Sequence, residues 1–374
     1  MTRVLVTGGM GFIGSHTVDH LVSDGFDVIV IDNLERQVHH RGKPPYLNSK
    51  ARYIQGDVRS NRVLHRVLNE VDYVIHLAAA VGVGQSFWQV RKYIDTNIGG
   101  TATLYELLLK DGRARKRIKK IVIASSKSIY GEGAYLCKHH GSVYPATRPV
   151  SQLKKHLWDV TCPKCGNSME ARGIDEAKPP QNLSPYALSK YATETLSIDY
   201  ALLTGIPTVA FRYFNVYGPR QSLSNPYTGV VSLFLSRLMH SRPPIVFEDG
   251  NQTRDFVFVR DVAKLNLEAL KAKAEGIFNL GTNTPTSLLT IAGILAGLSH
   301  SNIEPEVPGQ FRPGDNRHDF ADNSKLMKAF PRTRFTPLKS GLEELLEWSH
   351  TQKTVDLSRR ENMERKRYFG PAWT

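Results

Sequence analysis

Cysteine is scarce in this chain, and long hydrophobic runs are missing. The 374 residues include 3 cysteines, all between Cys137 and Cys165, which is not the pattern of a disulfide framework. No stretch of about 20 residues is apolar enough to span a bilayer. The start, MTRVLVTGG, enters an apolar strand without a charged and then apolar leader. These absences predict a cytoplasmic protein that has no membrane partner.

Acidic residues are also in deficit. Lysine and arginine exceed aspartate and glutamate by 49 − 35 = 14, and the pI is about 9.6. The excess gathers in two clusters, residues 110–120 and 359–367. Neither cluster interleaves aromatic residues or matches a nucleic-acid module, so we interpret both as solvated surface and do not expect a nucleic-acid partner. An anionic small molecule such as a nucleotide diphosphate needs only a few arginines.

Apolar runs alternate with amphipathic segments from residue 3 to residue 122. The runs at 28–31 and 121–124 are apolar on both faces, as is typical of strands buried in a parallel sheet. A hydrophobic content of 41% over this length supports one large domain or two joined ones. The pattern therefore predicts an α/β fold with a doubly wound parallel sheet of the Rossmann type.

The alternation of apolar runs and amphipathic segments changes twice along the chain. We expect a dinucleotide-binding Rossmann domain over 1–214, interrupted by an irregular insertion over 131–180 that holds all the cysteines. From 215 to 352 the elements are shorter and turn signals are frequent, which predicts a smaller, irregular α/β substrate lobe with some segments returning to the first domain. Residues 353–374 form a charged tail.

A glycine-rich turn follows the first predicted strand. Gly8, Gly11 and Gly14 stand between a strand and a helix, where a side chain would collide with a pyrophosphate or with the strand beneath. Asp32 closes the second strand, 18 residues after Gly14. A carboxylate there accepts hydrogen bonds from ribose hydroxyls and repels a 2′-phosphate, which favours NAD over NADP.

Tyr186 and Lys190 lie four residues apart in SPYALSKYA, on one face of a predicted helix. A phenol has a pKa of about 10, and moving it to neutrality takes roughly 3 units, about 4 kcal/mol. A neighbouring ammonium helps to supply this stabilisation. Such pairs are common on solvated helices, but together with the glycine turn this pair predicts proton transfer. The segment 124–131, at the end of a predicted parallel strand, brings hydroxyls toward a substrate.

Five motifs together resemble the extended short-chain dehydrogenase/reductase family, specifically its nucleotide-sugar epimerases and dehydratases. They are TGGMGFIGS, HLAA, SSKSIYG, YALSK and RYFNVYGPRQ. The resemblance covers nearly the whole chain. It implies that Tyr186 is the catalytic base, that Lys190 also holds the nicotinamide ribose, and that Ser126 hydrogen-bonds the reacting sugar hydroxyl.

The family resemblance also implies the ligand-binding residues. The expected cofactor-binding residues are Gly8, Gly11, Phe12, Ile13, Gly14, Asp32, Asn33, Asp57, Val58, Leu77, Ala78, Ala79, Asn97, Ser125, Tyr186 and Lys190. The expected substrate-binding residues are Ser126, Asn215, Arg254, Arg312 and Asp315. Arginines suit phosphate oxygens, and an aspartate suits ribose hydroxyls. A homodimer paired through helices near 90–109 and 187–203 is a further implication.

The residue after Ser126 bears on the reaction. Dehydratases of the family place an acid there, because loss of water needs a general acid; this chain has Lys127, and Glu132 lies further on. Elimination is disfavoured, which leaves epimerisation at C4 by transient oxidation and re-reduction. The alternatives are a UDP-sugar 4-epimerase, a dehydratase, a decarboxylase, a 4-reductase, or a non-catalytic nucleotide-sensing or nucleic-acid-binding protein.

Within the family, one branch is most similar, the dTDP-L-rhamnose 4-epimerase-like proteins. The similarity lies in AAAVGVGQS, SIYGEG, SNPYTGV and the cysteine-bearing insertion. It implies a nucleotide-linked 6-deoxyhexose that is interconverted between the L-rhamno and L-talo forms.

The insertion carries two short ligand pairs typical of a zinc ribbon. Cys137 and His140 form one pair, Cys162 and Cys165 the other, with 21 residues between the inner ligands. The resembling proteins often have cysteine in both pairs, so His140 is a substitution that still gives a sound Cys3His site. His139 is the rival ligand, and three thiols without metal are the alternative. Such a closed site predicts a structural zinc that braces the loop over the sugar pocket.

Overall fold

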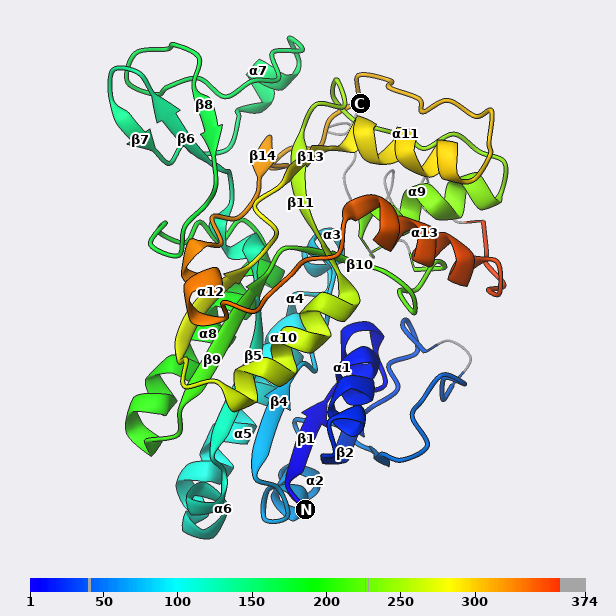
Figure 1. Ribbon diagram of the computed structural model, residues 1–374. Helices are drawn as coiled ribbons and strands as arrows, with labels where there is room; N and C mark the ends of the chain where they lie inside the picture. Colours follow the sequence, from blue (N-terminus) through cyan, green and yellow to red (C-terminus); the bar gives the residue numbers. More distant parts are fainter. Residues whose placement is uncertain (40–41, 226, 228, 357–374) are drawn as a thin grey trace.

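A seven-stranded parallel sheet forms the centre of the molecule (Figure 1). The computed structural model describes residues 1–39, 42–225, 227 and 229–356, so the predicted charged tail lies outside the described residues beyond 356. In spatial order the strands are β3 (Arg52–Gln55), β2 (Asp27–Asp32), β1 (Arg3–Thr7), β4 (Tyr73–His76), β5 (Lys120–Ser126), β9 (Thr208–Tyr213) and β12 (Gly276–Leu280). The predicted doubly wound Rossmann-type α/β sheet is confirmed.

Helices cover both faces of this sheet because its strands are apolar on both sides. Val4 and Val6 of β1 pack toward one helical layer, whereas Leu5 packs toward the other. The first layer contains α1 (Phe12–Ser23) and α10 (Val259–Lys271), and the second contains α2 (Asn61–Leu68), α5 (Gly100–Lys110) and α8 (Pro185–Thr204). Short turns connect them: α3 (Val83–Ser86), α4 (Val90–Tyr93), a π-helical stretch (Ile94–Gly99), α6 (Gly112–Arg117) and a 3₁₀ turn (Lys127–Tyr130).

The order of the strands determines where ligands can bind. The chain leaves β1 toward β2 on one side and returns through β4 on the other, which makes a topological switch point between β1 and β4. In such sheets, ligands bind at the carboxyl ends of the strands beside the switch point. The residues that end there are Thr7, which pairs with His76 in the sheet, and Ser126 of β5.

A second lobe covers this edge of the sheet (Figure 1). Its strands are β10 (Asn215–Tyr217), β11 (Thr253–Phe258), β13 (Pro285–Ser287) and β14 (His318–Asp319). Its helices are α9 (Val230–Met239), α11 (Leu288–Leu298) and α13 (Leu338–Ser349), which share a core with β11, while α12 (Ser324–Ala329) packs near β12. The lobe places β11 and β14 opposite the end of β5.

The cysteine-bearing insertion forms a small antiparallel sheet at the upper left of Figure 1. Its strands are β6 (Ala134–Cys137), β7 (Gly141–Val143) and β8 (Glu170–Arg172), in the order β7-β6-β8, and it includes the single turn α7 (Val150–Leu153). The chain rejoins the main body where Ile174 pairs with Ala321. The insertion therefore lies beside the second lobe.

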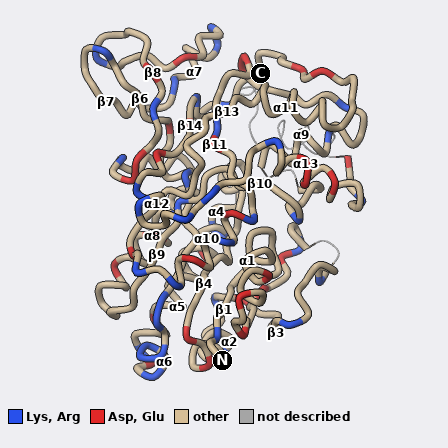
Figure 2. The backbone as a smooth tube through the Cα atoms, in the orientation of Figure 1, with Lys and Arg blue, Asp and Glu red and all other residues tan. Residues whose placement is uncertain are grey.

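The basic cluster of residues 110–120 is centred on α6 (Figure 2). Arg113, Lys116 and Arg117 are exposed, and the Asp111 carboxylate caps the helix by accepting the N–H groups of Arg113 and Ala114. The second predicted cluster, 359–367, falls outside the described residues. Among the residues described, no helix combines the length and the apolar character that crossing a bilayer requires.

Candidate active site

One cavity of about 1350 Å³ lies between the sheet and the second lobe. It is larger than the roughly 300–1,000 Å³ usual for a pocket that holds one small ligand. The glycine turn lines one part of it, Arg254, Arg312 and Asp315 line another, and Ser126, Tyr186 and Lys190 line it as well. The cavity therefore has room for a dinucleotide and a nucleotide sugar together.

The glycine turn is packed as a dinucleotide site requires. A Cβ at Gly8 would lie 2.9 Å from the backbone of Ala78, and one at Gly14 would lie 2.1 Å from the Gly8 carbonyl oxygen. Gly8 also has φ +70°, which favours glycine. Because Gly11 is the N-cap of α1 and has no side chain to bond the first N–H groups, these donors suit a pyrophosphate.

Asp32 is fixed at the end of β2 by backbone donors. Its carboxylate accepts the N–H of Met10 at 3.0 Å and the N–H of Leu34 at 2.9 Å. His39 Nε2 lies 3.7 Å from Asp32 Oδ1. Asp32 lines the cavity, and each carboxylate oxygen has a second lone pair with which to accept a ribose hydroxyl.

Most of the predicted cofactor-binding residues line this cavity. They are Gly8, Gly11, Phe12, Ile13, Gly14, Asp32, Asn33, Val58, Leu77, Ala78, Ala79, Ser125, Tyr186 and Lys190. Asp57 and Asn97 do not, and the structure gives them other partners. The Asp57 carboxylate accepts two hydrogen bonds from the Arg59 guanidinium, at 2.9 and 2.7 Å, and these lower its pKa.

Asn97 is buried beneath the segment that follows β4. Its amide exchanges hydrogen bonds with the backbone of Ala80, at 2.7 and 3.1 Å, and donates to Ser189 Oγ at 2.8 Å. It therefore holds the backbone of the cavity wall instead of lining the cavity. The family resemblance pointed to this residue, and the fold adds that it supports the backbone of the cavity wall.

Tyr186 and Lys190 project from the start of α8. Ser184 is the N-cap and accepts the N–H of Ala187 at 3.1 Å, and Pro185 occupies the first turn, where its fixed φ favours helix initiation. Both side chains are nearly buried, with exposed fractions of 8% for Tyr186 and 5% for Lys190. A capped helix end thus fixes the two groups in the cavity wall.

Burial has more effect on this pair than their mutual charge does. It raises the pKa of Tyr186, and the neighbouring Ser126 hydroxyl lowers that pKa only in part. Burial also lowers the pKa of Lys190 to about 8, against the raising effect of Glu194. The expectation that the ammonium acidifies the phenol is thus not met by the protein alone, since desolvation penalises both charged forms.

Ser126 lies at the end of β5, and its side chain points to the start of the next turn. Its Oγ accepts the N–H of Ser128 at 3.2 Å, and Ser126 lines the cavity together with Tyr186. Lys127, in the position of the dehydratase acid, forms an ion pair with Asp319. Glu132 is fully buried and accepts hydrogen bonds from Tyr135 Oη at 2.9 Å and from backbone N–H groups. The position after Ser126 therefore places a lysine, and not an acid, in the cavity lining, and Glu132 is not part of that lining.

A buried network beneath the site was missed from the sequence. Glu194 Oε2 accepts from Ser125 Oγ at 2.6 Å, and both carboxylate oxygens bond the Arg212 guanidinium, at 2.6 and 2.9 Å. Arg212 also donates to Tyr130 Oη at 2.7 Å. The available signal was spacing, because Glu194 is four residues beyond Lys190 and shares its helix face.

The other part of the cavity carries the expected phosphate and nucleoside residues. Arg254 Nη2 donates to Asp315 Oδ1 at 3.1 Å, and the Arg312 guanidinium lies 4.5 Å from the ring centroid of Phe247. Asn215 also lines the cavity, and its Oδ1 is buried without a hydrogen-bond partner among the described residues. An acceptor of this kind suits a hydroxyl donor from a ligand.

The insertion brings together four potential metal ligands. The ligand atoms of Cys137, His140, Cys162 and Cys165 lie within 4.8 Å of one another. His140 Nδ1 is 3.5 Å from two of the sulfurs, and Cys137 Sγ is 3.7 Å from Cys165 Sγ. Tetrahedral zinc, with Zn–S of about 2.3 Å and Zn–N of about 2.0 Å, separates its ligands by roughly 3.5 to 3.8 Å. The residues fit zinc, and His139 is not among them.

Comparison with known proteins identifies the family. The profile described as "NAD dependent epimerase/dehydratase family" matches residues 4–281. The chain is 36% identical over 352 residues to a dTDP-L-rhamnose 4-epimerase of Burkholderia thailandensis, covering 92% of this chain and 94% of the relative. It is 30% identical over 358 residues to a UDP-N-acetyl-alpha-D-glucosaminuronate decarboxylase of Bacillus cytotoxicus, covering 92% and 97%.

A solved structure gives the same result. The UDP-glucuronic acid 4-epimerase of Bacillus cereus, in complex with UDP-glucuronic acid and NAD, superposes with a TM-score of 0.75 at 27% identity, covering 93% of this chain and 98% of that one. The family predicted from the motifs is confirmed: this chain belongs to the NAD dependent epimerase/dehydratase family and is an NAD-dependent enzyme of its nucleotide-sugar epimerase group.

Proposed function

We propose that this protein is an NAD-dependent 4-epimerase that interconverts dTDP-L-rhamnose and dTDP-6-deoxy-L-talose. The observation that carries the proposal is that Ser126, Tyr186 and Lys190 line one cavity together with a dinucleotide turn and arginines for a second nucleotide. The lack of an acid after Ser126 supports epimerisation over elimination.

The reaction assigns one task to each residue. Ser126 accepts or donates the hydrogen bond that orients the C4 hydroxyl, and Tyr186, as phenolate, takes its proton. Bound NAD, held by the glycine turn and Asp32, would supply the hydride acceptor and donor for C4. Lys190 would hold the nicotinamide ribose close to Tyr186, where its ammonium opposes, but in the protein alone does not overcome, the effect of burial on the phenol. Tyr186 returns the proton after the 4-keto sugar has rotated, so the reaction has no net redox change.

The choice of a 6-deoxy sugar has support from the cavity wall. Val81 and Val83 line the cavity beside Gly82, which approaches the Tyr93 hydroxyl; the Tyr93 ring lies 6.1 Å from that of Tyr186. Apolar residues in the cavity lining suit the methyl group of a 6-deoxyhexose better than a hydroxymethyl or a carboxylate. The Burkholderia relative bears the name of this activity.

We also propose that Cys137, His140, Cys162 and Cys165 hold one structural zinc ion. Four protein ligands complete a tetrahedral shell and leave no open position for a substrate, so the ion stabilises the insertion and takes no part in the reaction. Metal analysis of the purified protein should find about one zinc per chain. Homodimerisation, a cytoplasmic location and the absence of a nucleic-acid partner remain predictions.

The test of the function is direct. Purified protein is incubated with dTDP-L-rhamnose, and in parallel with UDP-glucose, without added cofactor. Mass spectrometry and NMR then separate the outcomes, because an isomer keeps its mass whereas loss of water or carbon dioxide lowers it. A product only from UDP-glucose would reassign the sugar. Salt-dependent nucleic-acid binding without any turnover would favour the non-catalytic alternative.

A further inference from the structure

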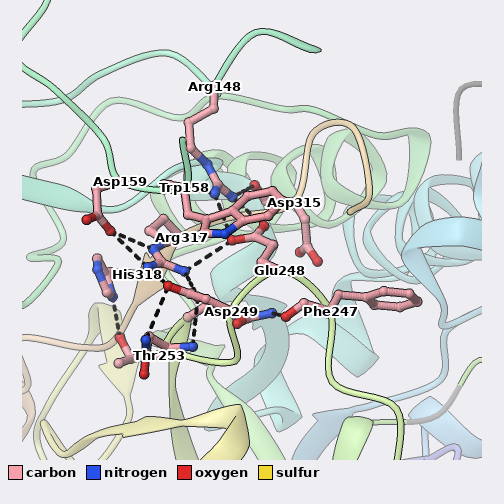
Figure 3. Close-up of polar contacts among 12 residues, drawn as sticks. Arg148, Trp158, Asp159, Phe247, Glu248, Asp249, Thr253, Asp315, Arg317 and His318 are labelled. Atoms are coloured by element: carbon pink, nitrogen blue, oxygen red, sulfur yellow. Dashed lines mark hydrogen bonds and ion pairs between the residues drawn. The ribbon is translucent and has the colours of Figure 1, made fainter. Parts of the chain in front are cut away.

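The insertion is joined to the second lobe by a buried ion pair (Figure 3). Arg148, five residues after β7, donates to both carboxylate oxygens of Glu248, at 2.8 and 2.9 Å. Each side chain is only 1% exposed. The same guanidinium donates to the carbonyl oxygens of Trp158, at 2.7 Å, and Asp315, at 3.0 Å. Arg148 thus ties one segment of the insertion to two separate loops of the lobe.

A second pair extends this junction. Asp159 of the insertion accepts from the Arg317 guanidinium at 2.9 and 3.1 Å. Arg317 also donates to both carboxylate oxygens of Asp249, at 2.6 and 2.8 Å, and to Glu248 at 3.2 Å. The Trp158 ring lies 6.3 Å from that of Phe311. Residues 148–159 therefore contact both the 247–249 loop and the 311–317 loop.

The 311–317 loop carries Arg312 and Asp315, which are expected to bind the nucleotide, and the 247–249 loop carries Phe247, which also lines the cavity. Phe247, which stacks with Arg312, directly precedes Glu248 in the chain, and Phe311 directly precedes Arg312. The Asp315 carbonyl accepts a hydrogen bond from Arg148, and its carboxylate accepts one from Arg254. Each of these cavity residues is thus held by the insertion directly or through its neighbour in the chain.

Charge gives the junction a second effect. Glu248 and Asp249 lie on the loop that carries Phe247, and their negative charge would oppose a diphosphate. Arg148 pairs with Glu248 in a buried setting, where charge is poorly screened, and Arg317 pairs with Glu248 and with the partly exposed Asp249. The two guanidiniums therefore offset the charge of these two carboxylates.

The cysteine cluster fixes one end of the same segment. Asp159 and Trp158 lie three and four residues before Cys162, one of the four clustered ligands. A bound metal would restrain this short connection and with it the partners of Arg148 and Arg317.

We propose that Arg148 is a positioning residue for the nucleoside-diphosphate part of the substrate, and that the insertion with its metal cluster is the support through which it acts. The inference rests on the proposed function, because it takes Arg254, Arg312 and Asp315 as the nucleotide site. It predicts that damage to the support weakens nucleotide binding and leaves proton transfer at Tyr186 intact.

The test measures dTDP and UDP affinity by calorimetry on the NAD-loaded protein, together with KM and kcat. Arg148→Met should raise the nucleotide Kd and KM about tenfold, because the residues that bind the nucleotide lose their support, with kcat within about twofold. Arg148→Lys should recover part of the affinity. Leu295→Ala, a cavity in the core of the same lobe, is the control: it should lower the melting temperature without moving Kd.

If Arg148→Met does not fold, the same affinities are measured on Glu248→Gln and on the double variant Arg148→Met/Glu248→Gln. The double variant should fold because it leaves no buried charge without its partner. Turnover by the wild type with an unchanged Kd in these variants would overturn the inference alone. A wild type that neither binds nucleotide nor forms an isomer would instead overturn the proposed function.

Two adjacent histidines allow a matched test of whether the metal-ligand cluster supports nucleotide binding. His140→Ala should lower the zinc content and raise the nucleotide Kd in the same direction as Arg148→Met. His139→Ala, one residue away and outside the cluster, should change neither. Equal Kd values in the two variants would contradict a role for the cluster in nucleotide binding.

Discussion

Replacing Lys190 with methionine should make the protein more stable and inactive at the same time. The native pKa of Lys190 is about 8, against an ordinary value of 10.5, and burial is the main cause. A difference of 2.5 units corresponds to about 3 kcal/mol at 1.36 kcal/mol per unit. Methionine keeps most of the apolar stem, and Glu194 keeps its two bonds to Arg212. The gain at pH 7 should therefore be about 2 to 3 kcal/mol.

The dependence on pH follows from which state holds the proton. Between pH 8 and 10.5 the unfolded chain binds a proton on Lys190 that the native protein has released, so native stability rises with pH. Below pH 8 both states are protonated and the cost of burial is fully present. The advantage of Lys190→Met should thus be largest below pH 8 and should vanish as pH rises through 10.5.

Urea unfolding of both proteins at pH 7 and pH 9.5, each stripped of NAD, measures this difference. NAD must be removed because a ligand bound only to the native wild type would mask the effect. A variant less stable than the wild type at pH 7, or an advantage that grows with pH, would refute the argument that burial of the ammonium costs stability.

Three further outcomes are expected. Tyr186→Phe should lower kcat by about 10² to 10⁴, the usual contribution of a general base, while protein-bound NAD measured after denaturation stays at the wild-type level; near-normal turnover would remove the base assignment. Glu194→Gln should leave Arg212 without its buried counter-charge and lower the unfolding free energy by about 3 kcal/mol, and an unchanged urea midpoint would contradict this. Chelation should remove zinc and raise the KM for the nucleotide sugar, and retention of both fold and kinetics after metal loss would argue against the zinc proposal.

Local pattern predicted the first half of the fold and the centre of the site. The glycine turn, Asp32 and the Tyr186–Lys190 pair depend on short-range spacing, and the structure brings them to one cavity. Asp57, also predicted from the sequence, is outside the cavity lining, and spacing does not show that Arg59, two residues on, binds its carboxylate. The pKa of Tyr186 was misjudged because its burial follows from packing of the fold and not from its neighbours in the chain.

Contacts between distant segments were beyond prediction. Arg148 and Glu248 are separated by 100 residues, and neither lies in a sequence motif from which its partner could be predicted. Their pairing depends on how the insertion sits against the second lobe, which no periodicity in the sequence encodes. The same holds for Arg212 and Glu194, although the helix that carries Glu194 was predicted.

The two buried ion pairs have a common physical consequence for the cavity. Arg212–Glu194 lies beneath the proton-transfer residues and Arg148–Glu248 beside the nucleotide residues. A buried pair adds little net stability compared with an apolar pair of similar volume, but loss of one partner costs about 3 to 5 kcal/mol. The main effect of each pair is therefore to destabilise arrangements in which its two segments separate. Its contribution to the stability of the fold is smaller. On this reasoning, replacing both members of a pair should restore stability, while ligand binding or turnover at the adjoining part of the cavity stays impaired.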